Sequence, residues 1–80
     1  MENCMNQIQF DGKNPEMLKN LMALYGDQKY PFYGENEDGE STSISIFPDK
    51  IVYVTFQHNG WIRKNFYDAN GYPDGETYEK

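Results

Sequence analysis

The stretch Ser41–Tyr67 contains most of the side chains that could form a hydrophobic core. Runs rich in Ile, Val, Thr, Phe and Tyr are separated there by turn signals at Pro48–Asp49 and at Asn59–Gly60. Runs of β-branched and aromatic residues bounded by such turns are typical of strands joined in hairpins. The pattern therefore predicts three consecutive antiparallel β-strands.

The register of these strands decides which side chains share a face, because a shift of one residue moves every side chain to the opposite face. We expect a three-residue loop at each turn, with Gly60 and Lys50 in the left-handed conformation. One face would then hold an apolar set around Lys64: Ile44, Ile46, Val52, Val54, Phe56, Ile62 and Phe66. The other face would hold Phe47, Ile51, Tyr53, Thr55, Trp61, Arg63, Asn65 and Tyr67.

This second face is too aromatic for an ordinary solvated sheet surface. Either a strand at residues 6–10 or the segment Tyr30–Tyr33 folds across it, or it is exposed and binds a partner. Tyr, Trp and Arg are the residue types most frequent at binding hot spots. The candidate partner-binding residues on this face are Tyr53, Trp61, Arg63 and Tyr67.

Residues 14–25 have the pattern of one amphipathic helix. Asn14 can cap it, Pro15 suits its first position, and Gly26 can end it. An apolar stripe with helical spacing is formed by Leu18, Leu21, Met22 and Tyr25. We expect this helix to pack on one face of the sheet.

The remaining segments are interpreted as loops. Residues 27–40 contain Pro31, Gly34 and Gly39, and we expect residues 34–40 to form an acidic mobile loop. Residues 68–80 should be a turn-rich acidic tail that ends in a further edge strand near 76–79. The prediction is a single small domain over residues 1–80, of the α+β class, with an antiparallel meander of three to five strands and one helix.

The placement of charge narrows the choice of partners. Thirteen acids and seven bases give a net charge of −6. Because phosphate contacts need clustered Lys and Arg, direct nucleic-acid binding is disfavoured, whereas a larger basic protein would be attracted. Four acids lie within six residues and are candidates for imitating phosphates: Glu35, Glu37, Asp38 and Glu40.

Catalytic and metal-binding chemistry finds little support in the sequence. One cysteine, Cys4, and one histidine, His58, allow no internal disulfide and no zinc site made of those residue types. His58 lies beside a turn, where a structural role is expected, and no catalytic motif is present. We expect a protein that is not an enzyme, has no cofactor or metal, and is cytoplasmic, since no secretory signal or membrane-spanning segment is apparent.

A short, acidic, cysteine-poor and aromatic-rich chain of this kind resembles small accessory proteins of phages and mobile elements, including anti-CRISPR inhibitors. The acid cluster, the net charge and the absence of a catalytic motif favour a first hypothesis, an inhibitor that blocks a larger basic nucleic-acid-binding protein. The alternative is that the four acids only form a solvated loop. A second hypothesis is a structural or assembly module that self-associates, for example as a homodimer, through the aromatic sheet face or an open strand edge.

Overall fold

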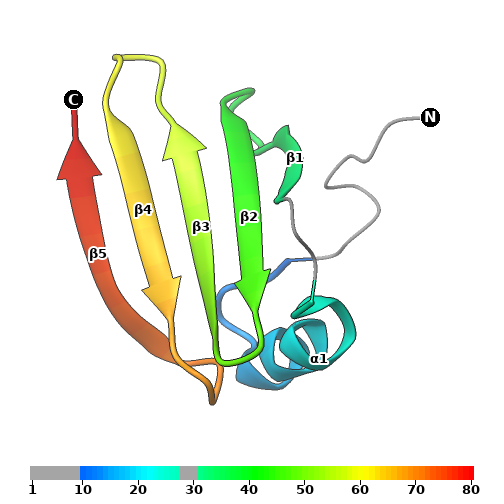
Figure 1. Cartoon of the computed structure of the whole chain (residues 1–80). Helices are drawn as coiled ribbons and strands as arrows, with labels where there is room; N and C mark the ends of the chain where they lie inside the picture. Colours follow the sequence, from blue (N-terminus) through cyan, green and yellow to red (C-terminus); the bar gives the residue numbers. More distant parts are fainter. Residues whose placement is uncertain (1–9, 28–30) are drawn as a thin grey trace.

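One helix and five strands make up the computed structural model, which describes residues 10–27 and 31–80. The helix is α1 (Pro15–Tyr25), and the strands are β1 (Phe32–Glu35), β2 (Ser41–Phe47), β3 (Lys50–Phe56), β4 (Ile62–Tyr67) and β5 (Pro73–Glu79). Each strand pairs antiparallel with the next, so the sheet order follows the sequence, and α1 contacts β2 and β3 (Figure 1). The predicted α+β class and the meander are confirmed. No helix in the described part of the chain is long and apolar enough to cross a membrane.

The helix forms where its sequence signals predicted it. Asn14 Oδ1 accepts the backbone N–H of Met17 at 3.2 Å, and Pro15 occupies the first turn. At the other end, the N–H of Gly26 donates to the carbonyl of Met22 at 3.0 Å. These contacts satisfy backbone groups that the helix ends otherwise leave unpaired.

The hydrophobic core lies between α1 and one face of the sheet. From the helix it takes Leu18, Leu21 and Met22, all buried. From the sheet it takes Phe32, Ile44, Ile46 and Ile51. Tyr25 closes one side, with its ring edge-on to Phe32 at a centroid distance of 5.3 Å.

The predicted register is right for one hairpin and wrong for the other. Between β3 and β4, Val54 lies opposite Lys64, and Gly60 has φ +90° in a three-residue loop, as expected. Between β2 and β3, the loop is only Pro48–Asp49, which places Ile46 opposite Ile51 instead of Val52. Within the described residues no amino acid except glycine has a positive φ, so the shorter loop spares Lys50 that strain.

This correction changes the composition of the two faces. Ile44 and Ile46 lie on the same face as Ile51 and Tyr53, under the helix, and are not grouped with Val52. Ile46 and Ile51, which the shorter loop pairs, are both buried beneath α1, so the hydrophobic effect favours this register.

Two further expectations need correction at the ends of the sheet. Residues 32–35 were assigned to a loop but form β1, where Gly34 pairs with Thr42 and Phe32 becomes buried. Most of the strand expected at residues 6–10 lies outside the described residues, and Phe10, which is described, is not in a strand. Cys4 and Tyr30 also lie outside the described residues. The final strand is present and begins earlier than expected, at Pro73, with a bulge opposite Asn65 and Tyr67.

Candidate functional site

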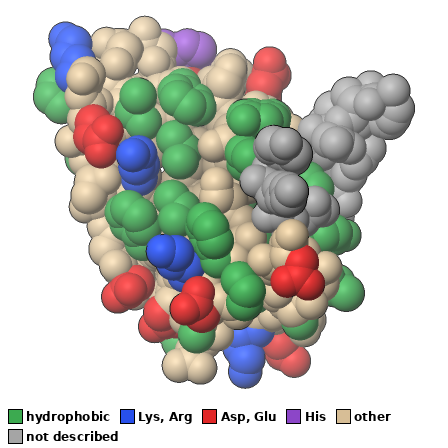
Figure 2. All heavy atoms as spheres, viewed as in Figure 1, with side chains coloured by type: hydrophobic (Ala, Val, Ile, Leu, Met, Phe, Trp, Pro, Cys, Tyr) green, Lys and Arg blue, Asp and Glu red, His purple; other side chains and the backbone are tan. Residues whose placement is uncertain are grey.

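The two faces of the sheet differ in what covers them. Alternation along the strands places one group of side chains opposite the face that packs on α1. We call this surface the open face; its apolar members are Phe47, Val52, Val54, Phe56, Ile62 and Phe66. Figure 2 shows hydrophobic side chains gathered over the middle of the sheet, with basic side chains among them.

The open face is apolar but not bare of charge. Phe56 is 44% exposed and Phe47 is 40% exposed. Lys50 Nζ lies 5.0 Å from the ring centroid of Phe47, and Lys64 Nζ lies 3.4 Å from Glu79 Oε2. The predicted apolar face grouped most of these residues correctly, and they lie on the side away from the helix. Ile44 and Ile46, which were predicted to lie with them, are on the helix side.

The predicted aromatic surface is partly covered by the chain itself. Tyr53 and Tyr67 lie on the helix side of the sheet and pack against the core. The ring of Phe10 stacks on Tyr53 at 4.6 Å and meets Tyr67 edge-on at 5.7 Å. Burial raises the pKa of the Tyr67 hydroxyl.

The other two members of that predicted set have separate environments. The guanidinium of Arg63 lies 5.9 Å from the ring centroid of Tyr78, and its buried Nε has no hydrogen-bond partner among the described residues. Trp61 comes before β4, is 39% exposed, and has Lys80 Nζ 5.6 Å from its ring centroid. Of the four residues, Trp61 is exposed, and Tyr53, Arg63 and Tyr67 are partly buried.

The acidic residues lie on and beside the turn between β1 and β2. We call residues 35–40 the acidic turn. Asn36 organises it: Asn36 Oδ1 accepts the N–H groups of Asp38 at 3.0 Å and Glu40 at 2.9 Å. Asn36 Nδ2 donates to Glu40 Oε1 at 3.0 Å, and Gly39 has φ +80°. Asn36, with Asp38 and Gly39 two and three residues after it, is a turn signal that could have identified Asn36 from the sequence.

Glu40 and His58 join this turn to the loop between β3 and β4. Glu40 Oε2 accepts the backbone N–H of His58 at 3.1 Å, and His58 Nε2 lies 3.0 Å from the carbonyl oxygen of Asp38. The hydrogen bond from Asn36, followed by the one from His58, holds the pKa of Glu40 below its ordinary value. Glu40 therefore links the β1–β2 turn to the β3–β4 loop, and both of its carboxylate oxygens already accept hydrogen bonds.

The remaining three acids are available to a partner. Glu35, Glu37 and Asp38 are all exposed. Within residues 10–27 and 31–80 their carboxylates make no hydrogen bond or ion pair. Of the predicted acidic set, the structure thus leaves these three side chains free and assigns Glu40 to the support of the turn.

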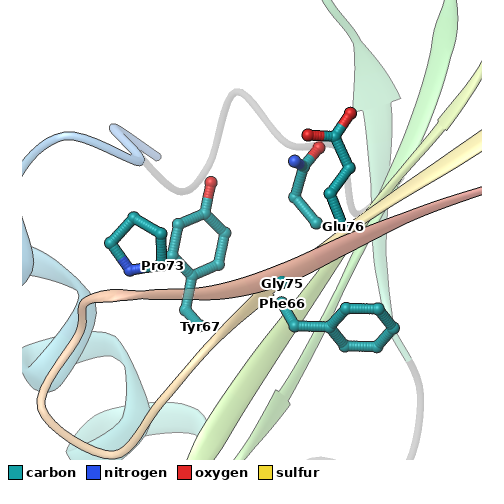
Figure 3. Close-up of a pocket in the computed structure, with 6 residues that line it drawn as sticks. Phe66, Tyr67, Pro73, Gly75 and Glu76 are labelled. Carbon is teal, nitrogen blue, oxygen red and sulfur yellow. The ribbon is translucent and has the colours of Figure 1, made fainter.

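A shallow depression lies between β4 and β5. Its volume is about 250 Å³, and it is open to solvent. Figure 3 shows Tyr67 beside Pro73 on one side of the strands, with Phe66 pointing away on the other. Glu76 is the one acid in its lining, so no pair of carboxylates for acid and base catalysis meets there. In the described part of the chain, no group of three His, Cys, Asp or Glu side chains could hold a metal ion.

Comparison of the chain with protein-family models, with curated proteins and with solved structures finds no match.

Proposed function

We propose that this chain is a small, non-enzymatic binding protein that inhibits a larger basic protein by occupying its nucleic-acid-binding surface. The observation that carries this proposal is the acidic turn, where Glu35, Glu37 and Asp38 present exposed carboxylates without partners in the described structure. Such carboxylates accept the charge-assisted hydrogen bonds that Lys and Arg otherwise give to phosphate groups. In this proposal the chain is one of the small accessory proteins of phages and mobile elements that its sequence resembles.

The support beneath the acids favours binding. Asn36, Glu40 and His58 hold the turn by hydrogen bonds before any partner arrives. A loop that is already ordered loses less conformational entropy on association, so more of its interaction energy contributes to affinity. The net charge of −6 adds long-range attraction toward a basic surface and speeds encounter.

The test neutralises the free acids and leaves Glu40 in place, because loss of Glu40 would disturb the turn itself. The variant carries Glu35→Gln, Glu37→Gln and Asp38→Asn. A matched control carries Asp49→Asn, Asp74→Asn and Glu76→Gln, which changes the net charge equally at exposed positions elsewhere.

The tagged native chain is used to capture proteins from its host, and the affinity of the captured protein is then measured for each variant against salt. We expect the acidic-turn variant to bind about tenfold or more weakly and to have a shallower salt dependence, while the control binds nearly as well as the native chain. Equal affinity and equal salt dependence for the two variants would rule out the acidic turn as the binding element.

A further inference from the structure

We propose that the open face is a self-association surface, on which a second copy of this chain packs sheet against sheet. This inference does not depend on a basic partner, and the open face shares only Glu35 with the acidic turn. It also differs from dimerisation through the aromatic face that the sequence suggested, because Phe10 already covers Tyr53 and contacts Tyr67.

The composition of the open face is unlike that of a solvated sheet. An antiparallel sheet with one face on the core normally alternates apolar residues inward with polar residues outward. Here the central strands β3 and β4 carry apolar side chains outward as well, with Val52 opposite Phe66 and Phe56 opposite Ile62. Contiguous apolar surface of this kind marks interaction sites on soluble proteins.

The shape of the molecule provides enough area for a dimer. Its extents are 33 × 33 × 21 Å, which sets an upper limit of the order of 1,000 Å² on the area of its broad side, and a typical stable interface needs about 800 Å² per partner. Two such sheets pack face to face about 10 Å apart with their side chains interleaved. A second copy can therefore cover the open face without help from another protein.

The charges on this face favour a second copy over a strongly charged partner. Strand alternation places Lys50, Lys64, Glu35 and Glu79 on the same side of the sheet, two of each sign. Lys64 and Glu79 already compensate each other at 3.4 Å. A two-fold symmetric contact brings the same surface together from both copies, so local charge balance avoids repulsion despite the net charge of −6.

Sedimentation of the purified full-length chain tests this proposal over micromolar to submillimolar concentrations. We expect a reversible species with twice the mass of one chain, and we expect salt to strengthen it by screening the repulsion between two acidic molecules. Binding to a basic partner would weaken with salt, so failure of one proposal can be told apart from failure of the other. A chain that remains monomeric at every protein and salt concentration tested would overturn this inference. The open face would then bind a molecule other than a second copy of this chain.

Two matched variants locate the contact. Phe56→Lys places a charge on the open face, and Leu24→Lys makes the same change at a helix position that is 73% exposed. We expect dimerisation to weaken about tenfold or more for Phe56→Lys and to stay unchanged for Leu24→Lys. If Phe56→Lys fails to fold, Phe47→Lys at the 40% exposed position replaces it. Equal dimerisation of the folded open-face variant and the Leu24→Lys control would overturn the proposal.

Discussion

At the scale of single residues, side-chain hydrogen bonds and glycines with positive φ determine the conformation of the loops. The hydrophobic pattern of the sequence does not identify these residues. Asp68 Oδ1 accepts the N–H groups of Asn70 at 2.9 Å and Tyr72 at 3.0 Å, which shapes the loop before β5. Gly71 within that loop is buried and has φ +85°. A Cβ atom there would collide with the carbonyl group of Pro15, so this loop lies against the start of α1.

Gly71→Ala should lower the free energy of unfolding by about 3 kcal/mol, of which roughly 1 kcal/mol is the cost of a positive φ and the rest follows from displacing the start of the helix. Gly60→Ala is the control, because Gly60 has φ +90° but no atom within 4 Å of its Cβ position. The control should lose only about 1 kcal/mol. Equilibrium unfolding in urea measures both, and equal losses would show that the loop does not press on Pro15.

Glu40 should make stability depend on pH. Because its folded pKa lies below the ordinary value of 4.5, the ionised carboxylate stabilises the fold above that pH, and this contribution is lost as the pH falls through the folded pKa. Glu40→Gln should therefore be less stable than the native chain at neutral pH, with the difference shrinking in acid.

Thermal melting at a series of pH values measures this difference. Glu37→Gln serves as the control, because that side chain is exposed and makes no hydrogen bond in the described structure. The control should melt close to the native chain at neutral pH. A difference between native chain and Glu40→Gln that stays constant into strong acid would contradict the role given to the Glu40 carboxylate.

At the scale of elements, the sequence predicts what local signals determine and fails where contacts distant in sequence decide. The helix and the β3–β4 hairpin were predicted correctly, since Asn14, Pro15 and Asn59–Gly60 act within a few residues. Pro48–Asp49 fits more than one loop length, and packing beneath the helix selects the shorter one. The four residues of β1 contain Gly34 and become a strand only by pairing with β2.

The register of β2 can be tested by comparing Ile46→Ala with Phe56→Ala. Ile46 is buried at 4% exposure beneath α1, so its truncation should cost about 3 kcal/mol through the cavity it leaves. Phe56 lies on the open face, so its truncation should cost the dilute monomer only about 1 kcal/mol. Urea unfolding at low protein concentration separates the two, and similar losses would argue against the register described.

At the scale of the whole molecule, the two candidate surfaces occupy different places. The acidic turn lies where the β1–β2 and β3–β4 loops meet, and the open face covers the middle of the sheet. The sequence shows that the acids cluster, but the loop predicted for residues 34–40 misplaces Glu35, which lies at the end of β1. The structural role of Glu40 could not be predicted, because it depends on a hydrogen bond with His58, which is 18 residues away in the chain. The exposure of the open face depends on which side of the sheet α1 covers, and that follows from the β2–β3 register.

The position of the core along the chain has a consequence for biosynthesis. Among residues 10–27 and 31–80, the buried apolar side chains of the core lie between Leu18 and Ile51, and β5 is exposed along its whole length. A growing chain therefore carries these buried side chains before β4 and β5 have been made, and Tyr67 of β4 packs against them later. Since each later strand pairs with the strand just before it, the sheet can be extended on the ribosome one neighbour at a time, with no need to await a distant segment.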